Sequence, residues 1–214
     1  MMPMPFDPGC RDCPRLSQFL DEVRAQYPAY HAAPVAPFGV DEPDLLIVGL
    51  APGMHGANAT GRPFTGDYAG ILLYDTLHRY GFSNQSESRA RNDGLQLYRC
   101  RITNAVKCLP PQNKPVGEEI ARCNRYLQVE IAGLRPGAVV IALGSIAHQA
   151  VLRACGLKPL AGKFGHNRVH DLPNGLKLVD SYHCSRYNTQ TRRLTEAMFH
   201  QVFARAAALL QATA

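Results

Sequence analysis

Apolar residues follow two patterns along this chain. Short continuous apolar runs, typical of strands buried on both faces, alternate with longer segments in which apolar residues recur every three or four positions, as on one face of a helix. The runs predict strands at residues 45–50, 102–106, 138–143 and 176–181. The longer segments predict helices at residues 14–26, 68–80, 118–134, 144–155 and 189–211. Because helices separate the strands, we expect a mainly parallel sheet with helices on both faces.

The strongest local signal lies between the first strand and the second helix. Residues 49–67 contain five glycines and two prolines, too many for a regular helix or strand. A glycine-rich loop after a buried strand can expose its backbone N–H groups to a ligand at the carboxyl edge of the sheet. The alternative is a loop that only reverses the chain.

The length and composition indicate one globular domain. With 214 residues, 46% hydrophobic and 19% charged, the chain can bury one core, so we expect a single domain over residues 1–214. Residues 1–43 supply a helix and an extended surface connection. No apolar run approaches the roughly 20 residues of a membrane span, and the N-terminus lacks the basic and apolar regions of a signal peptide. We therefore expect a cytoplasmic protein with no membrane contact.

The net charge of +6 favours polyanionic partners. Arginine side chains carry most of the positive charge, and they can contact nucleic-acid phosphates. An ordinary solvated basic surface is the alternative.

Seven cysteines point to metal binding or buried thiols, because disulfides are rare in the cytoplasm. Cys10 and Cys13 form a Cys-x2-Cys pair, whereas Cys108 and Cys123 lie far apart in the chain. Zinc sites usually use two closely spaced pairs, while one short and one long loop suit an iron–sulfur cluster. The spacing favours a cluster, and zinc or unligated thiols remain as alternatives. The spare thiols would be Cys100, Cys155 and Cys184.

Four segments would meet at the carboxyl ends of the predicted strands: the glycine-rich loop, residues 104–108, residues 144–145 and residues 182–186. They would bring together an amide, an imidazole, a carboxylate and an aromatic ring, those of Asn104, His183, Asp67 and Phe64. Such a site fits a planar heterocycle. The aromatic ring can stack on it, the amide can read its edge, and the imidazole can donate to an oxygen that gains charge.

Three segments resemble signature segments of the uracil-DNA glycosylase superfamily: the glycine-rich loop, residues 102–114 and residues 181–189. The cysteine set is similar to that of the iron–sulfur branches, families four and five. Leu50 and the Asp67 that follows Phe64-Thr65-Gly66 resemble family five, also called type B, because family four typically has Glu at the position of Leu50. The resemblance extends from Cys10 to about Thr195.

The resemblance implies a three-layer α/β/α sandwich with a central four-stranded, mainly parallel sheet. It also implies a structural [4Fe–4S] cluster on Cys10, Cys13, Cys108 and Cys123. The expected activity is that of a monofunctional DNA glycosylase of bacterial or archaeal type, which flips uracil out of DNA and hydrolyses its N-glycosidic bond to start base excision repair. Hypoxanthine and other deaminated bases are further expected substrates, and a monomer acting on nucleoid DNA is the expected form.

The resemblance also implies roles for residues of the base site. His183 would donate to uracil O2 as the base leaves as an anion, Asn104 would read the uracil edge, and Phe64 would stack on the ring. The backbone of the loop would line the site with Gly49, Leu50, Ala51, Pro52 and Gly53.

Asp67 is the candidate for the remaining chemistry. It would stabilise the cationic sugar or orient the attacking water, because Leu50 leaves no side-chain base where other families have one. The alternative role for Asp67 is a helix cap.

Ser185, Arg186 and Tyr187 follow the signature histidine, where related enzymes place a wedge that probes the gap left by the flipped base. A phosphate contact is the alternative. Cys184 stands where many members have proline. We expect no covalent chemistry at Cys184, because residues adjacent in a chain rarely face each other productively and no orienting third residue is evident.

Two other protein classes remain. One is an iron–sulfur nucleic-acid binding module without glycosylase turnover, and the other is an iron–sulfur redox protein. A redox protein would not account for Asn104, His183 or the glycine-rich loop.

Overall fold

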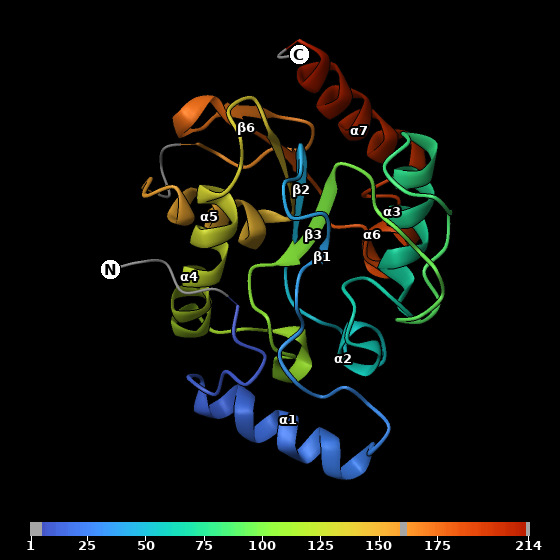
Figure 1. Cartoon of the computed structure of the whole chain (residues 1–214), viewed down its shortest axis with the longest axis vertical. Helices are drawn as coiled ribbons and strands as arrows, with labels where there is room; N and C mark the ends of the chain where they lie inside the picture. The colour runs from blue at the N-terminus through green and yellow to red at the C-terminus, as the bar shows by residue number, and fades with distance from the viewer. Residues whose placement is uncertain (1–5, 159–161, 213–214) are drawn as a thin grey trace.

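The computed structural model describes residues 6–158 and 162–212. A six-stranded sheet crosses this part of the chain in the order β1-β3-β2-β4-β6-β5 (Figure 1). Its strands are β1 (Phe38–Gly39), β2 (Leu45–Gly49), β3 (Cys100–Asn104), β4 (Val139–Leu143), β5 (Val169–Asp171) and β6 (Lys177–Ser181). The inner strands β3, β2, β4 and β6 are parallel to one another, which confirms the mainly parallel sheet.

The sheet has six strands rather than the four predicted. The additional strands β1 and β5 pair antiparallel with β3 and β6 at the two edges. β1 has two residues and β5 has three, and both are partly exposed. Strands this short and this accessible leave no apolar run in the sequence, so the hydrophobic pattern could not reveal them.

Helices connect the strands and cover both faces of the sheet (Figure 1). They are α1 (Pro14–Gln26), α2 (Ala57–Thr60), α3 (Tyr68–Arg79), α4 (Gly117–Ala132), α5 (Ser145–Ala154), α6 (Arg186–Gln190) and α7 (Glu196–Gln211), with short 3₁₀ turns η1 (Pro111–Asn113) and η3 (Pro173–Gly175). The predicted and observed bounds of α1, α3, α4 and α5 differ by two residues at most.

The predicted closing helix at residues 189–211 is wrong at its start, because two helices lie there. Arg192, between α6 and α7, has a φ of 56°, which is incompatible with a right-handed helix. Leu194 is fully buried after it. The Thr195 side chain then accepts a hydrogen bond from the Met198 N–H and caps α7. Residues 188–193 contain no apolar residue, so apolar periodicity could not locate the break.

Side chains of the parallel strands alternate between two hydrophobic clusters, one on each face of the sheet. Leu45 and Ile47 of β2 pack with residues of α3 and α7. Leu46 and Val48 pack with residues of α4 and α5. All four side chains are fully buried. This arrangement confirms the three-layer α/β/α sandwich.

A third cluster attaches α1 to the rest of the molecule. Leu16, Leu20 and Val23 of α1 pack with Val106 after β3 and Tyr126 of α4. In Figure 1, α1 (blue) lies below the strands, so the N-terminal segment reaches the region where the segment after β3 and α4 carry their own cysteines.

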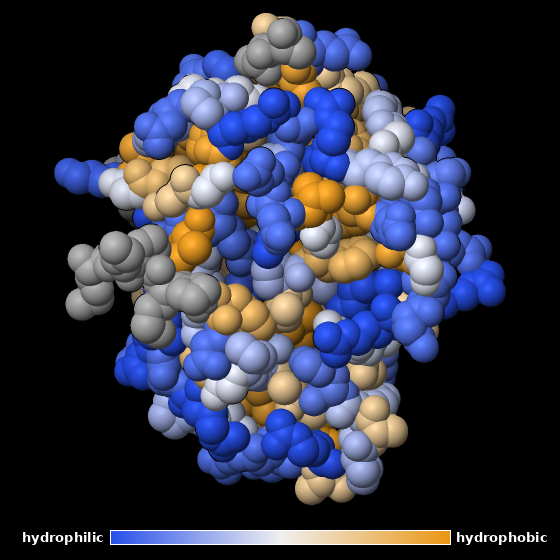
Figure 2. Space-filling view, viewed as in Figure 1, coloured by the Kyte–Doolittle hydropathy of each residue, from blue (hydrophilic) through white to orange (hydrophobic). Residues whose placement is uncertain are grey.

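Hydrophilic residues dominate the face shown in Figure 2, and hydrophobic residues appear on it as separate patches. Within the described ranges, no helix is both long and apolar enough to cross a membrane.

Candidate active site and cysteine cluster

The segments after β2, β3, β4 and β6 enclose a cavity of about 480 Å³. Nine predicted site residues line it: Leu50, Ala51, Gly53, Phe64, Asp67, Asn104, His183, Ser185 and Arg186. Gly49 and Pro52 belong to the same loop but do not form its wall, and neither does Tyr187. The carboxyl edge of the sheet therefore brings together groups from four distant parts of the sequence.

Gly49 allows the closest approach inside the site. A Cβ atom at this position would lie 2.4 Å from Asn104 Oδ1 and 2.7 Å from Phe64 Cζ. Any side chain at residue 49 would therefore displace the amide or the ring. Phe64 adopts a φ of 53°, a strained conformation for a bulky residue, and its ring lies 6.0 Å from that of His183, at an angle of 27°. The two rings form adjoining walls of the cavity.

The imidazole of His183 is neutral. Burial lowers the pKa of His183 from 6.5 to about 4. Its Nδ1 atom is buried and has no hydrogen-bond partner among the described residues, whereas its carbonyl oxygen accepts a bond of 2.8 Å from Asn188 Nδ2. The backbone of His183 is thus fixed while its ring stays available to a ligand.

The side chain of Asn104 is also available. Asn104 ends β3 and is 3% exposed. No described residue hydrogen-bonds to its Oδ1 atom, which is buried. A buried amide oxygen without a partner is costly, so a ligand that supplies a donor would gain free energy here.

Asp67 combines two positions, at the cavity wall and at the start of α3. Its Oδ1 atom accepts a hydrogen bond of 2.9 Å from the Gly70 N–H. Asp67 therefore caps α3, as the alternative prediction stated. Its Oδ2 atom faces the glycine-rich loop, since a Cβ on Gly56 would lie 2.7 Å from it. Burial raises the pKa of Asp67 above its usual value, and the N–H groups of Gly70 and Ala69 act in the opposite direction. One oxygen thus caps α3, and the other is directed at the glycine-rich loop.

Ser185, Arg186 and Tyr187 lie at the start of α6. The Ser185 side chain caps this helix by accepting from the Asn188 N–H. The Arg186 guanidinium lies 5.9 Å from the centre of the Tyr68 ring, and Tyr187 is 70% exposed. The predicted wedge residue is therefore accessible beside the cavity.

Sequence reasoning missed Tyr68 and Ile146, which also line the cavity and are exposed. Both belong to predicted helices, where an apolar residue usually indicates the core. Ile146 directly follows Gly144 and Ser145, which the sequence places at the predicted site. Its position next to these two residues could have indicated that it lines the cavity.

Cys184 is fully buried, and burial raises the pKa of its thiol. A thiol that stays protonated is a poor nucleophile. Cys100 is also fully buried, and Cys155 is partly buried at the end of α5.

Cys10, Cys13, Cys108 and Cys123 line one small cavity between α1, the segment after β3 and α4. Burial and the neighbouring thiols raise the pKa of Cys13 to about 11. The Lys107 N–H donates to Cys123 Sγ over 3.2 Å, and Arg125 Nη2 donates to Cys10 Sγ over 3.6 Å. The site thus supplies four sulfur ligands and nearby N–H donors.

The four sulfur atoms are not tightly grouped. A tetrahedral zinc ion holds its four sulfurs about 3.8 Å apart. Among the described residues, the groups of three or more ligand atoms within 4.8 Å of one another do not include these cysteines. Four thiols around one cavity are compatible with an iron–sulfur cluster, in which each thiolate binds a different iron.

The fold and cavity define a class: α/β proteins that bind a ligand at the carboxyl ends of a parallel sheet. Residues 36–207 match the family model described as Uracil DNA glycosylase superfamily, and the chain belongs to this superfamily.

Three relatives share much of the sequence, and each has the name Type-5 uracil-DNA glycosylase. The protein of Thermus thermophilus is 47% identical over 199 residues, which cover 91% of this chain and 90% of the relative. The protein of Mycobacterium leprae is 42% identical, with coverage of 91% and 88%. The protein of Pyrobaculum aerophilum is 41% identical, with coverage of 94% and 88%. The predicted resemblance to family five is thereby confirmed.

Proposed function

We propose that this chain is a DNA glycosylase that removes uracil from DNA by hydrolysing its N-glycosidic bond. The observation that carries the proposal is a cavity in which two buried polar atoms, His183 Nδ1 and Asn104 Oδ1, have no partner among the described residues. The type-5 relatives support uracil-containing DNA as the substrate.

The reaction requires the base outside the duplex. A stacked and paired nucleotide cannot reach a cavity at the edge of the sheet, so flipping it costs a few kcal/mol of unstacking. Phe64 would recover part of this cost by stacking on the flipped ring inside the cavity of about 480 Å³.

His183 and Asn104 recognise the base and assist its departure. Cleavage leaves negative charge on uracil, and the neutral His183 ring still carries one N–H that can donate a hydrogen bond to the O2 atom. Asn104 presents its Oδ1 atom to the N3–H of uracil, and its amide nitrogen can donate to the neighbouring carbonyl. Leu50, Ala51 and Gly53, which line the cavity, add backbone groups at the base, and Gly49 and Pro52 complete the loop.

Asp67 serves the sugar. Cleavage leaves positive charge on the sugar ring, which a carboxylate beside it stabilises, and the free Oδ2 atom can also orient the attacking water. The hydrogen bond from Gly70 keeps this carboxylate in one position.

The exposed residues beside the cavity contact the DNA. Arg186 offers positive charge to a phosphate, Ser185 fixes the start of α6, and Tyr187 enters the space left by the flipped base.

The same proposal includes a [4Fe–4S] cluster on Cys10, Cys13, Cys108 and Cys123. Its support is the set of four thiols that line one small cavity, together with the N–H donors beside two of them. The cluster would join α1, α4 and the segment after β3, and we assign it this structural role only. Cys13→Ser should lower the iron content per chain, while Cys155→Ser, at a partly buried spare thiol, should leave it unchanged.

The test uses an end-labelled oligonucleotide with one deoxyuridine, followed by hot alkali, which cuts at an abasic site. Uracil-dependent cutting that His183→Ala reduces strongly and His200→Ala leaves intact would support the proposal, since His200 does not line the cavity. Hypoxanthine in the same sequence tests the wider substrate range. Tight binding of uracil-DNA without cutting would instead favour a binding module, and reversible redox cycling without cutting would favour a redox protein.

A further inference from the structure

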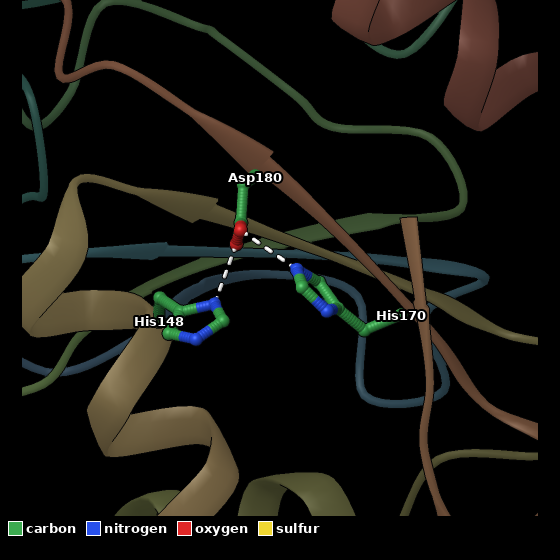
Figure 3. A group of neighbouring side chains, drawn as sticks. All are labelled: His148, His170 and Asp180. Carbon is green, nitrogen blue, oxygen red and sulfur yellow. Dashed lines mark hydrogen bonds and ion pairs between the residues drawn. The ribbon is translucent and has the colours of Figure 1, made fainter. Parts of the chain in front are cut away.

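A second polar cluster lies away from the cavity and from the cysteines. His148 of α5, His170 of β5 and Asp180 of β6 meet near the β5 edge of the sheet, and Figure 3 shows both imidazole rings directed at one carboxylate. His148 Nδ1 lies 2.7 Å from Asp180 Oδ1, and His170 Nε2 lies 2.8 Å from Asp180 Oδ2. The three side chains are 1%, 9% and 0% exposed. None of them lines the cavity at the strand ends.

The buried carboxylate requires a positive charge next to it. Asp180 accepts one backbone hydrogen bond, from the Gly165 N–H at 3.1 Å, and its other described partners are the two imidazoles. A fully buried carboxylate surrounded by neutral groups would be costly. A proton shared among the three side chains or a bound cation can offset this cost.

The orientation of His148 suits a metal ligand. Its Nε2 atom lies 2.9 Å from the Gly162 carbonyl oxygen, which can only accept, so Nε2 carries a hydrogen. In the neutral ring, Nδ1 then directs a lone pair towards Asp180. This is the arrangement that fixes metal-binding histidines, whose second nitrogen donates to a carbonyl or carboxylate.

The donor set defines the kind of ion. Each residue offers one ligand atom, and the three atoms lie within 4.8 Å of one another. Two imidazole nitrogens and a carboxylate are ligands typical of Zn²⁺ and of similar divalent transition metals. Rigid elements hold all three, which limits the rearrangement that binding would need.

We propose that His148, His170 and Asp180 form a binding site for a divalent transition-metal ion of the zinc class, separate from the cysteine cluster. The ion would join α5 to β5 and β6. It would thereby fasten two walls of the cavity, because α5 begins at Ser145 and β6 ends two residues before His183.

The test must distinguish this site from the thiols. Iron-loaded protein is treated with a chelator and titrated with Co²⁺ and then Zn²⁺. We expect one Co²⁺ per chain with visible d–d absorption and without the sulfur-to-cobalt charge transfer that thiolate ligands give, and we expect Zn²⁺ to displace it. Zinc should also raise the melting temperature.

His170→Gln and Asp180→Asn should weaken Zn²⁺ binding at least about 100-fold, beyond the usual effect of changing a residue outside the ligand shell. Both should abolish the rise in melting temperature while the iron content stays constant. A second group consists of the exposed Asp75 and Glu196 and the partly buried His200. His200→Ala is the matched control and should bind Zn²⁺ at the main site like the wild type. His170 lies on a short edge strand, so its variant should fold even if changes at Asp180 do not.

Two results would overturn the proposal. If the wild-type protein binds neither Co²⁺ nor Zn²⁺, the three side chains form a hydrogen-bonded cluster without a metal ion. Binding with sulfur-to-cobalt charge transfer, or binding unaffected by His170→Gln, would place the metal elsewhere. Neither result depends on whether the protein excises uracil.

Discussion

The cavity at the strand ends and the His148–His170–Asp180 cluster use the same kinds of side chain in opposite ways. In the cavity, His183 Nδ1 and Asn104 Oδ1 are buried without described partners. In the cluster, both oxygens of Asp180 and both ring nitrogens of His148 have partners within 3.1 Å. A buried polar atom without a partner lowers the stability of the free protein, and a ligand that pairs with it recovers that free energy. A buried polar atom that already has a partner in the protein stabilises the fold instead. The comparison therefore separates residues that would contact a flipped base from residues that hold α5, β5 and β6 together.

The largest expected effect separates the two regions directly. His183→Gln should slow uracil excision by about 1000-fold, because the flexible glutamine amide does not hold its N–H where the imidazole holds the donor to the leaving base, and should barely change the melting temperature. Single-turnover kinetics and thermal unfolding measure the two quantities.

Asp180→Asn should show the converse result. Removing one partner from a buried charged network should cost about 3 kcal/mol of unfolding free energy, while excision well below the melting temperature continues. If Asp180→Asn abolished excision in folded protein, or His183→Gln unfolded the chain, the division into binding and stability would be wrong.

Asp67 both lines the cavity and caps α3, and two substitutions separate these two contributions. Asp67→Asn keeps an oxygen for the Gly70 N–H but removes the negative charge, so excision should fall about 100-fold with an unchanged melting temperature. Asp67→Ala should lower the excision rate by a similar factor. It should also lower the free energy of unfolding by about 1 kcal/mol, because alanine cannot cap α3. Full activity in Asp67→Asn would reduce Asp67 to a helix cap.

The two histidine environments predict opposite pH dependences of stability. Because the pKa of His183 is lowered to about 4 from 6.5, its neutral form stabilises the fold above pH 6.5, and this contribution is lost as the pH falls through about 4. For His148, burial alone would lower the pKa, but the hydrogen bond and charge of Asp180, together with the Gly162 carbonyl, raise it above 6.5. Its contribution is present below pH 6.5 and is lost as the pH rises through the raised pKa.

Denaturant unfolding of metal-free protein across this pH range measures both effects. His183→Gln should flatten the acid side of the stability profile, and His148→Gln should flatten the neutral-to-alkaline side. The same change of slope in both variants would contradict the opposite shifts.

The smallest effect is expected at the DNA surface. Arg186→Ala should weaken DNA binding by several-fold and should reduce the slope of log affinity against log salt by about 1, because one phosphate contact is lost. Binding isotherms at several salt concentrations measure this slope. Arg153→Ala, at an arginine on α5 that does not line the cavity, is a suitable control.

The sequence predicted the elements whose signal is local. The buried run of β2 and the amphipathic pattern of α1 predict these elements closely, because each rests on residues adjacent in the chain or one helical turn apart. Strand β1 depends on pairing with the distant β3, β5 has only three residues and pairs with β6 across a short turn, and the break before α7 depends on a single backbone conformation at Arg192. None of these leaves a periodic trace.

The candidate site divides in the same way. Asn104, His183 and Asp67 stand in motifs with a recognisable local sequence, and the parallel sheet brings their ends together. The cluster around Asp180 could not be predicted, because His148, His170 and Asp180 are isolated in the sequence and converge only through the order of β4, β6 and β5.

Hydrogen bonding between β2 and β3 continues beyond the strands themselves. The Ala105 and Val106 N–H groups donate to the carbonyls of Gly49 and Leu50 over 2.9 and 3.0 Å. These bonds lie on the short stretch that leads from Asn104 to Cys108. We therefore expect exchange of these two amide hydrogens with solvent to require the glycine-rich loop to separate from the segment after β3. Such an opening would loosen the cavity and the cysteine cluster together.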